Sequence, residues 1–134
     1  MALGVPLTLR IEIPGLPPAE CSPNARVHWA VKAKAARQYG TDVFYLAVDA
    51  RNRSENPAEW QNLDNARVSV TFMLPDNRRR DLDNLIASFK SGLDAVVCCG
   101  ILLDDSAGHV TLSYSATQPF DAVTPMTIVE VSHE

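Results

Sequence analysis

The densest group of chemically active side chains lies in two short segments on either side of a predicted helix. Asp81 and Asp83 stand two residues apart, directly after the run Arg78–Arg80, and a second carboxylate pair, Asp104 and Asp105, follows the helix. In an extended chain, residues two positions apart project to the same side. Carboxylate oxygens are the ligands that Mg²⁺ takes, usually one or two of them together with water and substrate phosphate. The two pairs therefore predict a magnesium site at which a bound water could be activated to hydrolyse a phosphodiester.

The chain between the two pairs is long enough for them to meet. A helix from Asp83 to about Val97 carries the chain roughly 21 Å at about 1.5 Å per residue. Residues 98–104, if extended, return it by about 23 Å at about 3.3 Å per residue. We therefore expect Cys98–Leu103 to run back antiparallel to the helix and to bring Asp105 within about 10 Å of Asp83.

Each part of this group also has an ordinary structural role. Asp81 or Asp83 could simply cap the N-terminus of the helix, which is worth about 1 kcal/mol. Asp104 and Asp105 could form a solvated turn, and Arg78–Arg80 could be an exposed run of charge. Arginines beside carboxylates nevertheless combine forked phosphate donors with metal ligands, which is the combination that cleavage of a phosphodiester needs.

Strands and helices in alternation must position these residues. Alternating apolar and polar residues predict four strands, at Leu7–Ile13, Val68–Leu74, His109–Ala116 and Met126–Val131. Helical spacing predicts a helix, or two short ones, over His28–Asp49 with Gly40 as a possible break, and a second helix from about Asp83 to Val97, while Asn52–Asn65 is predicted to be a loop. The expected fold is α+β, a small mixed β-sheet of about four strands covered by two helices, in a single domain over residues 1–134.

The charge is unevenly distributed along the chain. The 134 residues carry 12 Lys+Arg against 16 Asp+Glu, a net charge of −4, with 46% hydrophobic residues. A mild excess of acid argues against a general nucleic-acid coat protein, because phosphate neutralisation supplies most of the affinity of such proteins. Every basic residue except Arg10 lies between Arg26 and Lys90, however, so the two halves of the chain differ in sign. This asymmetry favours a local anion-binding site.

Targeting signals and cysteine frameworks are not indicated. The N-terminal residues lack the basic and continuous apolar regions of a signal peptide, and no apolar run approaches the roughly 18 residues of a membrane span. Cys21, Cys98 and Cys99 are odd in number and contain no Cys-x-x-Cys pair. We interpret them as small core residues of a cytoplasmic protein.

The motif itself is similar to that of a known family. Arg-Arg-Asp-Leu-Asp-Asn-Leu, then a helix with a Lys and a Leu-Asp-Ala step, then Gly-x-x-x-Asp-Asp resembles the RusA family of Holliday-junction resolvases, frequently carried by phages and prophages; the match covers Pro75–Ser106. The resemblance implies a RusA-like homodimeric endonuclease that requires Mg²⁺, with Mn²⁺ as a substitute, and no organic cofactor. It also implies resolution of four-way DNA junctions by paired symmetric nicks in recombination and repair. The expected location is the cytoplasm, at the nucleoid, of a bacterial or phage-infected cell, with no membrane partner.

The resemblance also suggests roles for particular residues. It implies that Asp81, Asp83 and Asp105 are catalytic and bind the metal, with Asp104 as a further ligand or a neighbour of the ligands. The family's essential lysine, four residues after the second Asp of the motif, is replaced here by Ala87. Lys90 lies seven residues after Asp83, on the same face of one continuous predicted helix, and is our candidate for that role. The alternative is a solvated helix lysine.

Several residues are expected to contact DNA: Arg78, Arg79, Arg80, Lys32, Lys34, Arg37 and Asn84. Trp29 could stack on an unpaired base, although a core position is more typical of a large aromatic side chain. His28 could contact phosphate or begin the helix. Two other functions stay open: a branched-DNA-binding protein that has lost the chemistry, and a metal-binding domain whose partner is a protein.

Overall fold

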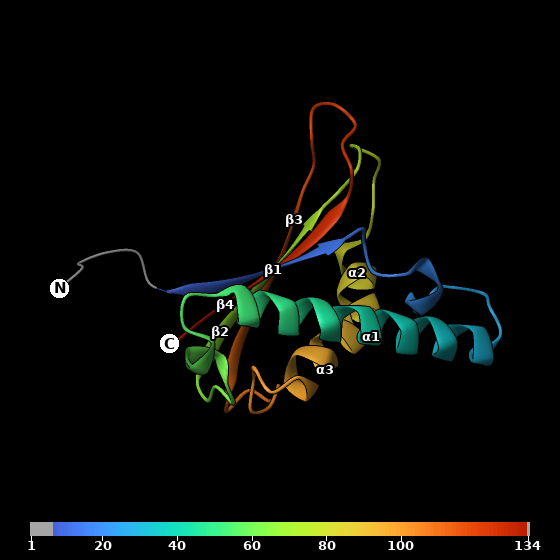
Figure 1. Cartoon of the computed structure of the whole chain (residues 1–134). Helices are drawn as coiled ribbons and strands as arrows, with labels where there is room; N and C mark the ends of the chain where they lie inside the picture. Colours follow the sequence, from blue (N-terminus) through green and yellow to red (C-terminus); the bar gives the residue numbers. More distant parts are fainter. Residues whose placement is uncertain (1–6, 134) are drawn as a thin grey trace.

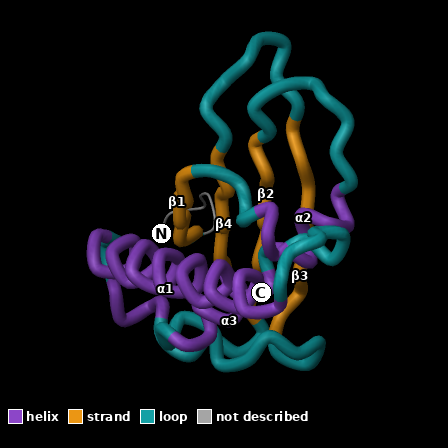
Figure 2. Tube along the Cα trace, turned by 90° about the vertical axis from the view of Figure 1, so that its right-hand side faces the viewer, coloured by secondary structure: helices purple, strands orange, loops and turns teal. Residues whose placement is uncertain are grey.

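A four-stranded mixed sheet with helices on one face forms the fold of the protein, in a computed structural model that describes residues 7–133 (Figures 1 and 2). The strands are β1 (Thr8–Pro14), β2 (Ala66–Met73), β3 (Val110–Thr117) and β4 (Met126–His133), in the spatial order β1-β4-β2-β3. β2 and β3 are parallel, whereas β4 is antiparallel to both β1 and β2. The predicted α+β class is confirmed, and each predicted strand is present to within two residues at either end.

The alternating strand patterns place the core between the sheet and the helices. In β1 the side chains of Leu9, Ile11 and Ile13 are buried while those between them are exposed. β2 continues the same face with Ala66, Val68, Val70 and Phe72, all fully buried. Burying apolar surface contributes about 25 cal/mol per Å², so this face accounts for much of the stability of the sheet.

The long helix α1 (Trp29–Arg53) crosses this buried face, and its N-terminal end extends beyond the sheet (Figure 1). Tyr39, Val43 and Ala47 recur every four residues and form its buried stripe. Gly40 does not break the helix. A Cβ at this position would lie 3.4 Å from the carbonyl oxygen of Ser91, an ordinary van der Waals contact, so α1 passes close to Ser91 of the next helical segment here.

The predicted second helix is wrong as a continuous element, because it is interrupted at Phe89 into α2 (Leu82–Ser88) and α3 (Lys90–Cys98). The Phe89 ring is fully buried and meets the rings of Tyr39, Phe72 and Tyr114 edge-on, with centroids 6.2 to 6.5 Å apart. A Cβ at Gly92 would lie 2.7 Å from that ring, so only glycine leaves it room. Packing of one aromatic residue therefore determines how the helical segment is divided.

The predicted loop Asn52–Asn65 is only partly a loop. α1 continues to Arg53, and a short 3₁₀ helix, η2 (Pro57–Trp60), buries Trp60. A second 3₁₀ helix, η1 (Ala19–Cys21), precedes α1. No helix in the described part of the chain combines the length and apolar character needed to cross a membrane.

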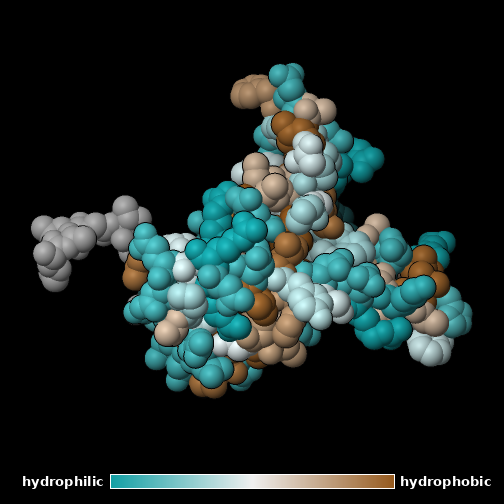
Figure 3. All heavy atoms as spheres, in the orientation of Figure 1, coloured by the Kyte–Doolittle hydropathy of each residue, from teal (hydrophilic) through white to brown (hydrophobic). Residues whose placement is uncertain are grey.

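Two loops project together beyond the same end of the sheet (Figure 1). Residues 74–81 connect β2 to α2, and residues 118–125 connect β3 to β4. They are tied by the Leu74 amide, which donates to the Thr117 carbonyl (3.0 Å), and by the Val123 amide, which donates to the Pro75 carbonyl (2.9 Å). The surface is mainly hydrophilic in Figure 3, yet apolar side chains are exposed at the end of this projection.

The cysteines are free, and only Cys99 is a core residue as predicted. Cys21 is partly buried and Cys98 is exposed, so the prediction is wrong for Cys98. Cys98 lies in the last turn of α3 and lines a surface cavity between α1 and α3 together with Ala95.

Candidate active site and nucleic-acid-binding surface

Lys90 joins the helical part of the motif to the second carboxylate pair. Its Nζ atom lies 2.8 Å from a carboxylate oxygen of Asp105 and 2.7 Å from one of Asp94. Asp105 raises the pKa of Lys90 most strongly, followed by Asp94, and Lys90 in return lowers the pKa of Asp105. Both pKa shifts favour the charged form of the group, as expected of an ion pair. At neutral pH the group is therefore a lysine cation held between two carboxylates.

The segment after α3 returns the chain to Lys90. Gly100, at φ +86°, reverses the chain at the end of the helix, as the left-handed conformation of a glycine permits. The Arg51 side chain donates to the Cys99 carbonyl (2.9 Å), and Ile101 and Leu102 are buried. Asp105 then lies beside the first turn of α3, so the predicted return of Cys98–Leu103 along the helix agrees with the Lys90–Asp105 contact.

Asp104 lies next to a histidine that sequence reasoning missed. One Asp104 oxygen accepts the Asp105 amide (2.8 Å), and the other lies 4.0 Å from Nε2 of His109. Nδ1 of His109 contacts Asp64 at 2.5 Å, and this partner raises the pKa of His109. Asp64 and His109 are 45 residues apart, and neither lies in a recognisable motif, so no local signal could have identified the pair.

The first carboxylate pair lies at the start of α2. Asp81 is the N-cap residue and its backbone carbonyl accepts the Asn84 amide (3.2 Å), but its side chain makes no capping hydrogen bond. Asp83 is exposed in the first turn. Neither carboxylate therefore forms the simple capping hydrogen bond, and both face solvent.

The carboxylates fit magnesium in their chemistry, since all are hard oxygen donors. The side-chain carboxylates of Asp81 and Asp83 make no hydrogen bond or ion pair within the described residues, so they are available as ligands. Within residues 7–133, however, no group of three or more His, Cys, Asp or Glu side chains is arranged to hold a metal ion. The meeting of Asp105 with Asp83 stays a prediction. Because the helix is interrupted at Phe89, the expectation that Lys90 and Asp83 share one face of a continuous helix is wrong.

The arginine run divides into a structural and an exposed part. Arg80 is mostly buried and pairs with Asp76, whose oxygen lies 2.8 Å from its Nη1. This ion pair and the Arg78 amide lower the pKa of Asp76. Arg78 and Arg79 are exposed on the projecting loop, so two of the three arginines are free to contact phosphate.

The three basic residues of α1 that we expect to contact DNA do not all lie beside Lys90. Lys32 lines a cavity of about 310 Å³ together with Lys90, Ser91 and Asp94. Arg37 lines a neighbouring cavity that also reaches Asp94, whereas Lys34 lines neither. Lys32 and Arg37 therefore flank Lys90 along the groove between α1 and α3.

Two other predicted contacts lie near the N-terminus of α1. The Asn84 side-chain oxygen accepts a long hydrogen bond from Asn24 (3.5 Å), which links α2 to the segment before α1. His28 begins the helix, because its Nδ1 accepts the Ala30 amide (3.1 Å). The expected core position of Trp29 is wrong: the side chain is 76% exposed beside the His28 ring, since α1 extends past the sheet at this end.

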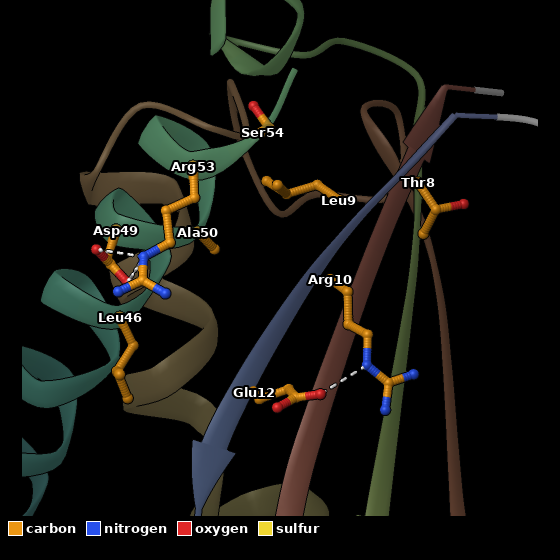
Figure 4. A pocket seen from close by; sticks show the side chains of 9 residues that line it. All are labelled: Thr8, Leu9, Arg10, Glu12, Leu46, Asp49, Ala50, Arg53 and Ser54. Atoms are coloured by element: carbon orange, nitrogen blue, oxygen red, sulfur yellow. Dashed lines mark hydrogen bonds and ion pairs between the residues drawn. The ribbon is translucent and has the colours of Figure 1, made fainter. Parts of the chain in front are cut away.

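The groove between β1 and the C-terminal half of α1 is a separate feature of the surface. It has a volume of about 420 Å³ and contains none of the predicted site residues. Its charged side chains pair within their own elements, Arg53 with Asp49 and Arg10 with Glu12, as Figure 4 shows. This groove therefore has no set of converging groups suited to phosphodiester chemistry.

Comparison with known proteins adds no family assignment. No protein-family model matches the chain, and no curated protein matches it. The similarity to the RusA family thus stays a prediction from the motif alone.

Proposed function

We propose that the protein is a Mg²⁺-dependent endonuclease that resolves four-way DNA junctions by paired nicks. The observation that supports this proposal most is the contact of Lys90 with Asp105, at 2.8 Å. The motif consists of two halves separated in sequence, and this contact brings a cation from one half to a carboxylate from the other. A site for hydrolysis of a phosphodiester needs both kinds of group at one place.

The chemistry would divide between the carboxylates and the lysine. Asp81, Asp83 and Asp105 would hold Mg²⁺, which when bound supplies charge neutralisation and a more acidic water. Lys90, kept protonated by Asp105 and Asp94, would donate to an oxygen of the scissile phosphate. In this scheme Asp94 positions the ammonium group and does not touch the DNA.

The exposed cations would bind the backbone of the junction. Arg78 and Arg79 on the projecting loop would contact phosphates, as would Lys32 and Arg37 along the groove beside Lys90. Trp29, which is exposed, would stack on a base near the point of strand exchange. Two symmetric nicks need two active sites, which a two-fold dimer would supply. The expected place of action is the cytoplasm, where such DNA substrates occur.

A nicking assay on synthetic four-way junctions tests the proposal. The wild-type protein should cut the junctions in Mg²⁺ and not in EDTA. Asp81→Asn and Asp83→Asn should each reduce the rate by about 10²-fold or more while retaining junction binding, because each removes a ligand and a repulsive charge. Glu55→Gln, an exposed acid beyond the other end of α1, is the matched control and should cut at the wild-type rate.

The assay also separates the rival functions. Salt-dependent junction binding without cleavage by the wild-type protein would contradict the nuclease and support a branched-DNA-binding protein. If the wild-type protein neither binds nor cuts junctions, a role in protein interaction becomes the better explanation. Undiminished cleavage by Asp83→Asn would rule out the proposed ligand set.

A further inference from the structure

Among residues 7–133, no strand other than β4 pairs with β1, so the edge of β1 that carries the Arg10 and Glu12 backbone groups has no neighbouring strand. β1 lies at one end of the strand order and pairs only with β4. The Gly15 amide donates to the Pro125 carbonyl (3.0 Å) in continuation of that register, so the odd-numbered residues of β1 direct their backbone groups toward β4. Arg10 and Glu12 therefore direct theirs outward. An edge of this kind can pair with another strand.

This edge opens onto a groove that follows α1. Leu9, Leu46 and Ala50 form the apolar part of the cavity shown in Figure 4. A second cavity, of about 370 Å³, continues past Leu46 to Ile13 and Tyr45, and Tyr45 is 68% exposed. Space beside the whole length of β1 is thus bounded by apolar side chains on the side of the helix.

The charged side chains on this edge are complementary to those on the same edge of a second copy of the chain. Arg10 and Glu12 lie on the same face of β1, with Arg10 Nε 3.0 Å from a Glu12 oxygen. If a second copy pairs antiparallel about a two-fold axis at Ile11, Arg10 lies opposite Glu12 of the partner subunit, and the reverse pair forms as well. Shifting the axis by one residue either way places Arg10 opposite Arg10 or Glu12 opposite Glu12. Opposite charges facing each other across two strands stabilise the pair, and like charges destabilise it.

We propose that two copies of this chain associate through β1, antiparallel about Ile11, to form one continuous sheet. Arg10 and Glu12 would each exchange both backbone hydrogen bonds with the opposing residue of the partner subunit. Leu9 would lie opposite Ile13 of the partner subunit, above the apolar part of the groove. A closed two-fold pair uses both β1 edges, so growth cannot continue through this surface. The inference concerns assembly alone and does not depend on the proposed nuclease activity.

Charge reversal of this edge gives a direct test by sedimentation velocity. The wild-type protein should sediment as a dimer at micromolar concentration. Arg10→Glu, which makes the edge wholly acidic, and Glu12→Arg, which makes it wholly basic, should each raise the dimer dissociation constant at least tenfold. An equimolar mixture of the two variants should form a heterodimer, since every acidic residue then faces a basic one. The pair within one strand is lost in both variants and is not restored by mixing, so recovery reports only the contact between strands.

Other results would overturn the proposal. These are a wild-type monomer at about 100 µM, a dimer that both variants retain, or variants that stay monomeric when mixed. Lys34→Glu, a charge reversal at an exposed position on α1, is the matched control and should remain dimeric. If either variant loses its circular dichroism spectrum, hydrogen exchange of the wild-type protein decides instead. The Arg10 and Glu12 amides should become protected as the dimer forms, and free exchange of these amides in the dimer contradicts the proposed edge.

Discussion

Lys90 and Asp105 are fifteen residues apart in sequence, yet Lys90 Nζ lies 2.8 Å from a carboxylate oxygen of Asp105. Asp94, one turn after Lys90 in α3, contacts the same nitrogen at 2.7 Å. The lysine is thus held by one residue of its own helix and one residue of the returning chain. Its position depends on the bend of the chain at Gly100 as much as on α3 itself.

Removing the Lys90 charge should affect activity much more than stability. Lys90→Met should reduce cleavage of four-way junctions by about 10²-fold, because it removes a donor to the developing charge. The side chain is largely exposed, so the loss in the free energy of unfolding should be at most about 1 kcal/mol. Single-turnover cleavage and urea denaturation measure the two effects. Arg53→Met, which removes another exposed ion pair, should change neither by much. Equal losses of activity in both variants would contradict a specific role for Lys90.

His109 should titrate above the ordinary histidine range because Asp64 stabilises its protonated form. Its folded pKa is raised, so the stability it contributes is fully present below its unfolded pKa of about 6.5 and is lost as the pH rises through the folded value. NMR titration of the ring should give a raised pKa in the wild-type protein and a lower one in Asp64→Asn. Asp42→Asn, an exposed change on α1, is the control. An unchanged His109 titration in Asp64→Asn would contradict the contact.

The strands could be predicted from the sequence because each depends on a local alternation of residues. Leu9, Ile11 and Ile13 are buried as their spacing indicates, since side chains on a strand alternate between its two faces. The interruption at Phe89 could not be predicted in the same way. It depends on rings that lie far away in sequence, at Tyr39, Phe72 and Tyr114.

The candidate site could be predicted to a similar degree. The Lys90 and Asp105 residue types and the returning segment followed from motif and chain length, and the two side chains do meet. The pairing of His109 with Asp64 and the exposure of Trp29 depend on how separate elements are arranged in space. Periodicity carries no information on either, because it describes one element at a time.

Gly92 should not tolerate alanine, although alanine favours helices. A Cβ at Gly92 would lie 2.7 Å from the Phe89 ring, which is fully buried and has no room to move. Overpacking costs about 1 to 3 kcal/mol, which exceeds the gain of about 1 kcal/mol in helix propensity. Gly92→Ala should therefore lower the free energy of unfolding, measured by urea denaturation. Gly40→Ala, whose Cβ would lie 3.4 Å from the Ser91 carbonyl oxygen, should be close to neutral. A stabilised Gly92→Ala variant would contradict the packing of Phe89.

Trp29 should report DNA binding by its fluorescence, because it is 76% exposed whereas Trp60 is only 4% exposed. In a Trp60→Phe variant the remaining emission should have the red-shifted maximum of a hydrated indole and should be quenched by iodide. A four-way junction should quench this emission and protect it from iodide if Trp29 stacks on a base, and added salt should reverse both effects. Trp29→Ala should weaken junction binding by about 1 to 3 kcal/mol and leave the free energy of unfolding nearly unchanged. Full access of iodide to Trp29 in a complex saturated with junction would exclude the stacking contact. That result would not contradict the proposed contacts of Arg78 and Arg79 with phosphate.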